Sequence, residues 1–316
     1  MMMKHRGASI LLAAFLLSTL PSHADAAEFA FGVIGQTIKT PNDAGPLVQA
    51  IAESDADNLA FVVADGFKRA DESCSDDLYQ QRYNVLANAK NGLILALAAG
   101  DWSECKSRNG RADGIERLAR LRELFFPDEF SLGASKLPLI RQSITPKFRS
   151  YVENARWEVG SVVFTAFNLP AGNNRYRTEA GRNSEFEDRA IATRDWLRHT
   201  FTNAALRKST GIVLICDGNP LAKNGQSRLF ESNGKRDGYA EVRQQLTTLA
   251  AKFPGKVLLI HNRTDARAPH DDKITWHGNL GELEVDAGWV KVVVKTGSSV
   301  IFTAKAGEPQ NPMQPQ

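Results

Sequence analysis

The chain has little net charge and no block of like charge. It has 39 basic and 36 acidic residues among 316, a formal net charge of +3, and the two signs are interspersed throughout. A protein that grips a nucleic-acid backbone needs a concentrated basic surface. The even distribution therefore excludes nucleic acid as an expected partner.

Long hydrophobic runs are also scarce, and the only strong one is N-terminal. Ala8–Leu20 follows Lys4 and Arg6, and the small-x-small pattern of residues 24–26 comes shortly after it. The run is shorter than the ~20 residues of a membrane span, and its flanks are typical of a cleavable signal peptide over residues 1–26. A retained N-terminal anchor is the alternative. We expect a secreted or periplasmic mature chain without a membrane span, with 37 basic and 35 acidic residues and a net charge of +2.

Cysteine is rare, with three residues in the chain. Cys74 and Cys105 lie in polar stretches, whereas Cys216 ends the apolar run GIVLIC and is expected to be a buried strand thiol. In an oxidising compartment, two cysteines in loops can pair. We expect a Cys74–Cys105 disulfide that closes a loop of about 30 residues; the alternative is three free thiols.

Short apolar runs alternate with amphipathic stretches, which predicts the α/β class in a domain spanning residues 27–305. The expected strands are Phe29–Ile34, Leu59–Ala64, Gly92–Ala98, Ser161–Asn168, Gly211–Cys216 and Lys256–His261. The expected helices are Gly45–Ser54, Asp76–Ala89, Gly114–Phe126, Ser184–Ala205 and Tyr239–Phe253. Trp289–Val294 and Ser298–Ala304 predict a closing β-hairpin. The Pro- and Gln-rich residues 306–316 predict a disordered tail.

Polar residues follow the expected strands at the edge where α/β proteins collect functional groups. Four of five strand ends present an aspartate: Asp65, Asp101, Asp217 and, after His261, Asp265. Such aspartates are either ligands for a hard divalent cation or caps and turn formers. The sequence predicts that they converge on one edge of the sheet.

The order of several motifs resembles the calcineurin-like metallophosphoesterases, in particular a secreted bacterial branch. The resemblance spans roughly residues 29–305. The matching segments are FGVIGQT, CSDDLY, AAGDWSEC, ERLARLRELFF, YVENARWE, VVFTAFNLPAGNN and WVKVVV. It implies a four-layer α/β/β/α sandwich with a metal site at the strand ends.

The resemblance also assigns roles to individual residues. It places Gln36 where the family has its first aspartate, Asp65 as the bridging carboxylate, and Asp101 in a shortened third motif. Asp217 stands near a family histidine, and the last motif falls on residues 262–265, where Arg263 opposes metal binding. The implied metal ligands are Gln36, Asp65, Asp101, Asp217 and Asp265, with Asp101 and His261 as catalytic residues. The implied cofactor is one or two divalent ions, namely Mn, Mg, Ca or Fe.

Two functions remain open at the level of sequence. The first is an exported metallophosphoesterase whose metal-dependent hydrolysis is impaired or lost because several ligand positions are replaced. The second is a non-catalytic binding protein on the same fold, with a small phosphoester or another anion as its ligand near Arg263. A cysteine hydrolase using Cys216 is the weakest reading, since this cysteine is expected inside a strand and lacks a nearby histidine in the sequence.

Overall fold

The N-terminal strands and the C-terminal hairpin share one sheet. The computed structural model describes residues 27–36, 38, 40–107, 109–177, 183–222, 236–263 and 273–307. Strands β1, β2 and β3 are parallel, and the hairpin β11–β12 adds to β1 in antiparallel fashion. The sheet order is β12 (Phe302–Ala306), β11 (Trp289–Lys295), β1 (Glu28–Ile34), β2 (Val62–Asp65) and β3 (Leu93–Ala96).

A second sheet is built from the middle of the chain. Its central strands β6, β7, β8 and β10 are parallel, and antiparallel strands flank them on both sides. The order is β4 (Ile140–Arg141), β5 (Ala155–Val159), β6 (Val162–Ala166), β7 (Gly211–Ile215), β8 (Lys256–Asn262), β10 (Leu280–Val285) and β9 (Thr275–His277).

The two sheets face each other across a shared apolar core. Alternate side chains of a strand point to opposite faces, so Phe31 of β1, together with Phe61 directly before β2, meets Phe164 of β6. The ring centroids of Phe31 and Phe164 are 5.2 Å apart, and those of Phe61 and Phe164 are 4.9 Å apart. Burial of these aromatic side chains on both inner faces fixes the sheets against one another.

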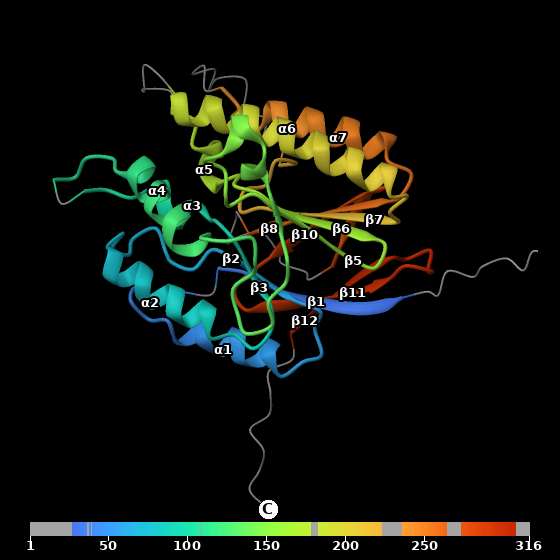
Figure 1. The fold of residues 1–316 in the computed structure, drawn as a ribbon, viewed down its shortest axis with the longest axis horizontal. Helices are drawn as coiled ribbons and strands as arrows, with labels where there is room; N and C mark the ends of the chain where they lie inside the picture. The colour runs from blue at the N-terminus through green and yellow to red at the C-terminus, as the bar shows by residue number, and fades with distance from the viewer. Residues whose placement is uncertain are drawn as a thin grey trace, which may run out of the picture.

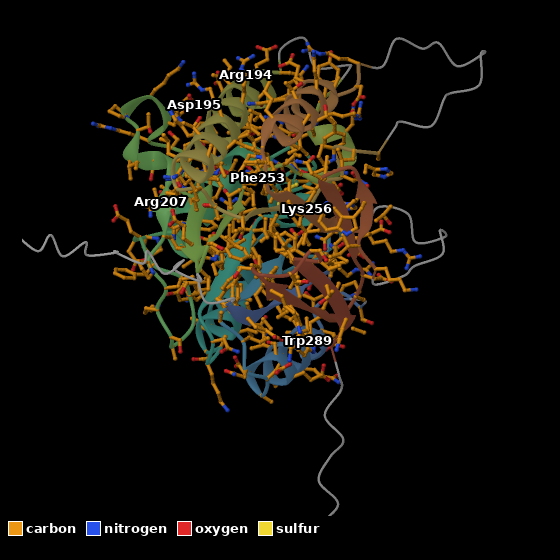
Figure 2. All side chains as sticks on the ribbon, turned by 90° about the vertical axis from the view of Figure 1, so that its right-hand side faces the viewer. Arg194, Asp195, Arg207, Phe253, Lys256 and Trp289 are labelled. Atoms are coloured by element: carbon orange, nitrogen blue, oxygen red, sulfur yellow. A yellow bond between two sulfur atoms is a disulfide. The ribbon has the colours of Figure 1, made fainter. Side chains whose placement is uncertain are left out.

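Helices cover the outer faces of both sheets (Figure 1). The first sheet packs against α1 (Gly45–Asp55), α2 (Asp76–Ala87) and α4 (Gly114–Phe125), through a second apolar core. The second sheet packs against α6 (Ser184–Leu206) and α7 (Ala240–Lys252), through a third. Phe253 and Trp289, which belong to these two outer cores, lie on opposite sides of the sheets in Figure 2.

The α/β class predicted from sequence is confirmed, and the expected strands and helices are all present with shifted ends. The hairpin's second strand begins at Phe302 rather than Ser298, because residues 296–300 form a longer turn. Strands β4, β5, β9 and β10 were not predicted.

The predicted disulfide between Cys74 and Cys105 is present, with Cα atoms 5.9 Å apart, and Cys216 is a buried free thiol. Within the described ranges, no helix combines the length and the apolar character that crossing a bilayer requires. The predicted signal peptide and all but the first two residues of the predicted tail lie outside the described residues.

Candidate functional site

The carboxyl ends of strands from both sheets meet at one buried polar cluster. Asp65 ends β2, Asn262 ends β8, Asp217 follows β7, and Asp101 lies on the short helix α3 (Ala99–Trp102) after β3. The Asn262 side-chain amide donates to the backbone oxygen of Asp65 at 3.1 Å and to Asp217 Oδ1 at 3.0 Å. We call Asp65, Asp101, Asp217 and Asn262 the acidic cluster; it joins the two sheets at this edge.

Both carboxylate oxygens of Asp101 accept hydrogen bonds from the backbone. Oδ1 accepts from the N–H groups of Phe67 (3.0 Å) and Lys68 (3.2 Å), and Oδ2 accepts from that of Ala98 (2.8 Å). The side chain is inaccessible to solvent, and burial raises its pKa to about 7, partly offset by these hydrogen bonds. Asp101 therefore ties the loop after β2 to the start of α3.

Asp217 is satisfied in the same way. Its Oδ2 accepts from the backbone N–H groups of Ala99 at 2.6 Å and Ala171 at 2.8 Å, while Oδ1 accepts from Asn262. Burial raises the pKa of Asp217, and the three hydrogen bonds oppose that rise. The carboxylate thus joins the segments that follow β3 and β6 to the last residue of β8.

Asp65 differs from its two neighbours. Both of its carboxylate oxygens are buried and, within the described part of the chain, meet no hydrogen-bond donor; the same holds for Asn262 Oδ1. Burial raises the pKa of Asp65 well above its usual range, and repulsion from Asp217 and Asp101 raises it further. Three buried acceptor atoms without donors form the unbalanced centre of the cluster.

A buried ammonium lies next to this centre. Lys68 Nζ donates to the backbone oxygens of Arg69 at 2.6 Å and Gly100 at 2.7 Å. Burial lowers the Lys68 pKa, and the nearby Asp101 carboxylate partly restores it. Lys68 therefore supplies a positive charge beside Asp101 from within the chain.

The predicted catalytic histidine faces a different set of side chains. His261 Nε2 lies 3.0 Å from Glu282 Oε1, and its Nδ1 lies 2.7 Å from the backbone oxygen of Asn262. Both ring nitrogens of His261 therefore face hydrogen-bond acceptors. The hydrogen bond from His261 is the main reason that the pKa of Glu282 is lowered. Glu282 also accepts from Asn219 Nδ2 at 2.7 Å.

The remaining predicted ligands are not part of the cluster as described. Gln36 is exposed, and its side-chain amide donates to the backbone oxygen of Lys68 at 3.4 Å. Asp265 lies outside the described residues. Arg263 pairs with Asp286 at 2.5 Å. Of the ligand set, the structure brings together Asp65, Asp101 and Asp217, and it adds Asn262, which sequence reasoning did not assign as a ligand.

A left-handed turn beside Asp217 was also missed. Gly172, Asn173, Asn174 and Arg175 all have positive φ angles between 54° and 71°. For residues other than glycine this conformation costs roughly 1–2 kcal/mol each, so the surroundings must hold it. Asn174 Nδ2 donates to the backbone oxygen of Gly238 at 2.9 Å, and Arg189 donates to Asn174 Oδ1. The only sequence signal was the run Gly-Asn-Asn, since both residue types tolerate positive φ.

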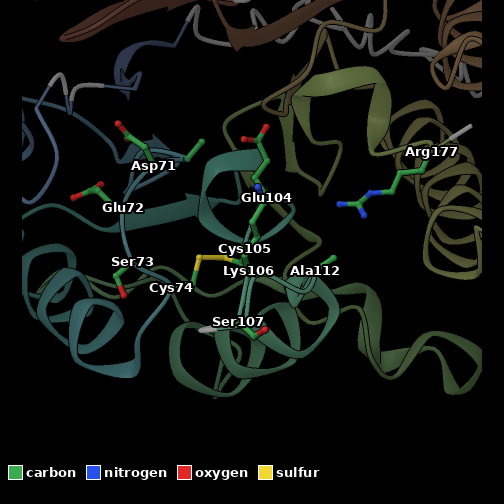
Figure 3. Close-up of a pocket in the computed structure, with 12 residues that line it drawn as sticks. Asp71, Glu72, Ser73, Cys74, Glu104, Cys105, Lys106, Ser107, Ala112 and Arg177 are labelled. Carbon is green, nitrogen blue, oxygen red and sulfur yellow. A yellow bond between two sulfur atoms is a disulfide. The ribbon is translucent and has the colours of Figure 1, made fainter. Parts of the chain in front are cut away.

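An open groove lies beyond the carboxyl ends of β2 and β3. Its volume is about 860 Å³. The Cys74–Cys105 disulfide forms part of its wall (Figure 3). We call it the disulfide groove; it is lined by residues 70–74 and 104–107 and by Gly110, Ala112 and Arg177. The acidic cluster does not line it, although loops from the same strand ends do.

Within the described residues, no group of three or more His, Cys, Asp and Glu side chains is placed to hold a metal ion. Comparison with known proteins finds neither a family model nor a curated protein that matches the chain.

Proposed function

We propose that the chain is a secreted or periplasmic binding protein that does not hydrolyse phosphoesters. It keeps the four-layer α/β/β/α sandwich of the metallophosphoesterases, with the ancestral catalytic edge now serving to hold the structure together. Three separate apolar cores, one between the sheets and one outside each, support the layer arrangement. The disulfide supports the compartment, because such bonds persist in oxidising environments.

The observation that carries the proposal is the bonding of Asp101 and Asp217. Every carboxylate oxygen of this pair accepts a hydrogen bond from the chain itself, five from backbone N–H groups and one from Asn262. A carboxylate offers about four lone-pair sites, so each of these two has about one left, whereas two catalytic metal ions need several free oxygen ligands between them. The residues present therefore do not fit a two-metal centre, and we derive no reaction step through one.

A second candidate, a phosphoesterase with a single metal ion, is favoured by one observation. The two oxygens of Asp65 and the amide oxygen of Asn262 are buried acceptors without donors in the described structure. Oxygen atoms of this kind suit a hard cation such as Mg²⁺, Mn²⁺ or Ca²⁺. When bound, such an ion would polarise a phosphoryl oxygen.

Metal content and hydrolysis decide between the two candidates. The purified protein is analysed for bound metal, and turnover of an aryl phosphate monoester and an aryl phosphate diester is then measured with and without added Mn²⁺. We expect less than stoichiometric metal and the same background hydrolysis in the wild type and in Asp65→Asn. Mn²⁺-stimulated turnover that Asp65→Asn abolishes would overturn the proposal and establish the single-metal enzyme.

A further inference from the structure

Some charged side chains of the disulfide groove have an ion-pair partner within the chain, and others have none among the described residues. Glu72 is buried and pairs with Arg82 at 2.7 Å, and Asp71 makes a two-pronged pair with Arg69 at 2.7 and 2.9 Å. These carboxylates are balanced within the chain. They form part of the wall of the groove, Glu72 in a buried ion pair and Asp71 in a solvent-exposed one.

Three other charges on the groove are unbalanced. Glu104, Lys106 and Arg177 are exposed, and none of their charged groups forms an ion pair or a hydrogen bond with a described residue. Arg177 extends from the far side of the groove toward the side that carries Glu104 (Figure 3). The free charges are therefore two cations and one carboxylate around a single space.

The walls of the groove are held in place before any ligand arrives. The disulfide joins the loop after β2 to the loop after α3. The second loop folds back on itself, since Ser107 N donates to Arg111 O at 2.8 Å and Asp113 N donates to Cys105 O at 2.9 Å. A preformed wall reduces the ordering cost of binding.

Small residues keep the groove open. Ala70, Gly110 and Ala112 line it. A Cβ atom added at Gly110 would meet no other atom within 4 Å, so the space beside this residue is open. A volume of about 860 Å³ lies within the range of sites that hold small molecules. The space is larger than a single inorganic anion needs.

We propose that the disulfide groove binds a small zwitterion with more carboxylates than amines, namely an acidic amino acid or a short acidic peptide. Arg177 and Lys106 would receive the carboxylates, Arg177 by the paired hydrogen bonds that a guanidinium makes. Glu104 would receive the ammonium group. The inference rests on the proposed function in one respect, that binding rather than hydrolysis is the activity of this chain.

Isothermal titration calorimetry on the purified chain tests the proposal, with L-glutamate and the dipeptide Glu-Glu as probes. L-Lysine and inorganic phosphate are the controls. We expect saturable heat with glutamate and with the dipeptide, and none with lysine. Arg177→Gln and Glu104→Gln should each weaken dipeptide binding roughly tenfold. The matched control Arg149→Gln, at an exposed arginine away from the groove, should leave it unchanged.

Three results would overturn the groove assignment. They are no heat with glutamate or dipeptide from folded protein, phosphate binding as tight as dipeptide binding, and dipeptide binding that Arg177→Gln leaves intact. Hydrolysis is measured on the same preparation. If the wild type binds the dipeptide and also shows Mn²⁺-stimulated turnover, only the proposed function is overturned. If it neither binds the dipeptide nor shows turnover, only the assignment of a ligand to the groove is overturned.

Discussion

Two buried ionic clusters contact the left-handed turn, and they differ in how their charges are matched. In the first, Glu185 pairs with Arg189 at 2.7 Å and Arg175 at 3.1 Å, and we call these three residues with Asn174 the arginine cluster. Burial alone would raise the pKa of Glu185, but the two guanidinium groups outweigh it and lower the pKa. In the acidic cluster, three carboxylates gather and all three pKa values are raised.

The difference shows what each cluster contributes. Charges that are matched at hydrogen-bond distance make a buried ion network costly to break, whereas unmatched carboxylates destabilise the fold until they take up protons or a cation. The turn touches both clusters, through Ala171 N to Asp217 and through Asn174 to Arg189. Its backbone is held from both clusters and also from the segment before α7, through Asn173 and Asn174 to Gly238.

The largest loss of stability is expected from removing an arginine of the arginine cluster. Arg189→Met removes a buried guanidinium, 1% exposed, and leaves Glu185 and Asn174 short of donors. We expect a loss of about 3–5 kcal/mol in the free energy of unfolding, measured by urea denaturation. The matched control is Arg198→Met on the same helix, whose guanidinium pairs with Asp195 but is 65% exposed. It should change stability by less than about 0.5 kcal/mol, and equal losses in the two variants would contradict the comparison.

Removing the disulfide should have the next largest effect, concentrated on the acidic cluster. Tyr79 donates to Asp101 O at 2.8 Å and contacts Cys105 Sγ at 3.5 Å, so the bond supports the segment that carries Asp101. The double variant with Cys74→Ser and Cys105→Ser should lose about 3 kcal/mol of stability. Hydrogen exchange should increase at the amides of Phe67 and Lys68.

The control for the disulfide is reductant. Dithiothreitol should lower the unfolding midpoint of the wild type and leave that of the double variant unchanged. The supporting role of the disulfide would be refuted if exchange at these two amides were the same in the double variant and the wild type.

Much of this arrangement could be predicted from the sequence. Parallel strands present their carboxyl ends at one edge, so Asp65, Asp101 and Asp217 were expected on one edge of a single sheet. They do lie together, but Asp65 and Asp101 come from strand ends of the first sheet and Asp217 from a strand end of the second. The sequence could not reveal how their oxygens are used. The N–H groups that donate to Asp217 Oδ2 come from Ala99 and Ala171, 118 and 46 residues away along the chain. Only the packing of both sheets brings them there.

His261 shows a signal that was available but not used. Neighbouring residues of a strand face opposite sides, and Ile260 packs between the sheets while Leu259 packs toward the helices. Asn262 thus shares the side of Ile260 and reaches Asp65, while His261 shares the side of Leu259. Strands β5 and β10 were missed because charged residues interrupt their apolar pattern, namely Arg156 and Glu158 in β5 and Glu282 and Glu284 in β10.

The smallest change in the free energy of unfolding is expected from a substitution at Asp65. It tests most directly whether the charges of the acidic cluster are unmatched. Asp65→Asn keeps the shape of the side chain and removes a carboxyl group whose pKa is raised by burial and by Asp217 and Asp101. A raised pKa in the folded state means that the folded protein holds a proton that the unfolded chain releases above about pH 4. The stability of the wild type therefore falls as pH rises through this window, and the variant lacks that loss.

We expect Asp65→Asn to be more stable than the wild type by about 1 kcal/mol at pH 8, the lower end of the cost of a buried polar group without a partner. The two proteins should be nearly equal at pH 4, as measured by urea denaturation at both pH values. Asp101→Asn is the matched control, and it should lose stability at both pH values, because Asp101 accepts three backbone N–H groups. If Asp65→Asn were instead less stable than the wild type at pH 8, the Asp65 carboxylate would have a stabilising partner in solution. The acidic cluster would then be as well matched as the arginine cluster.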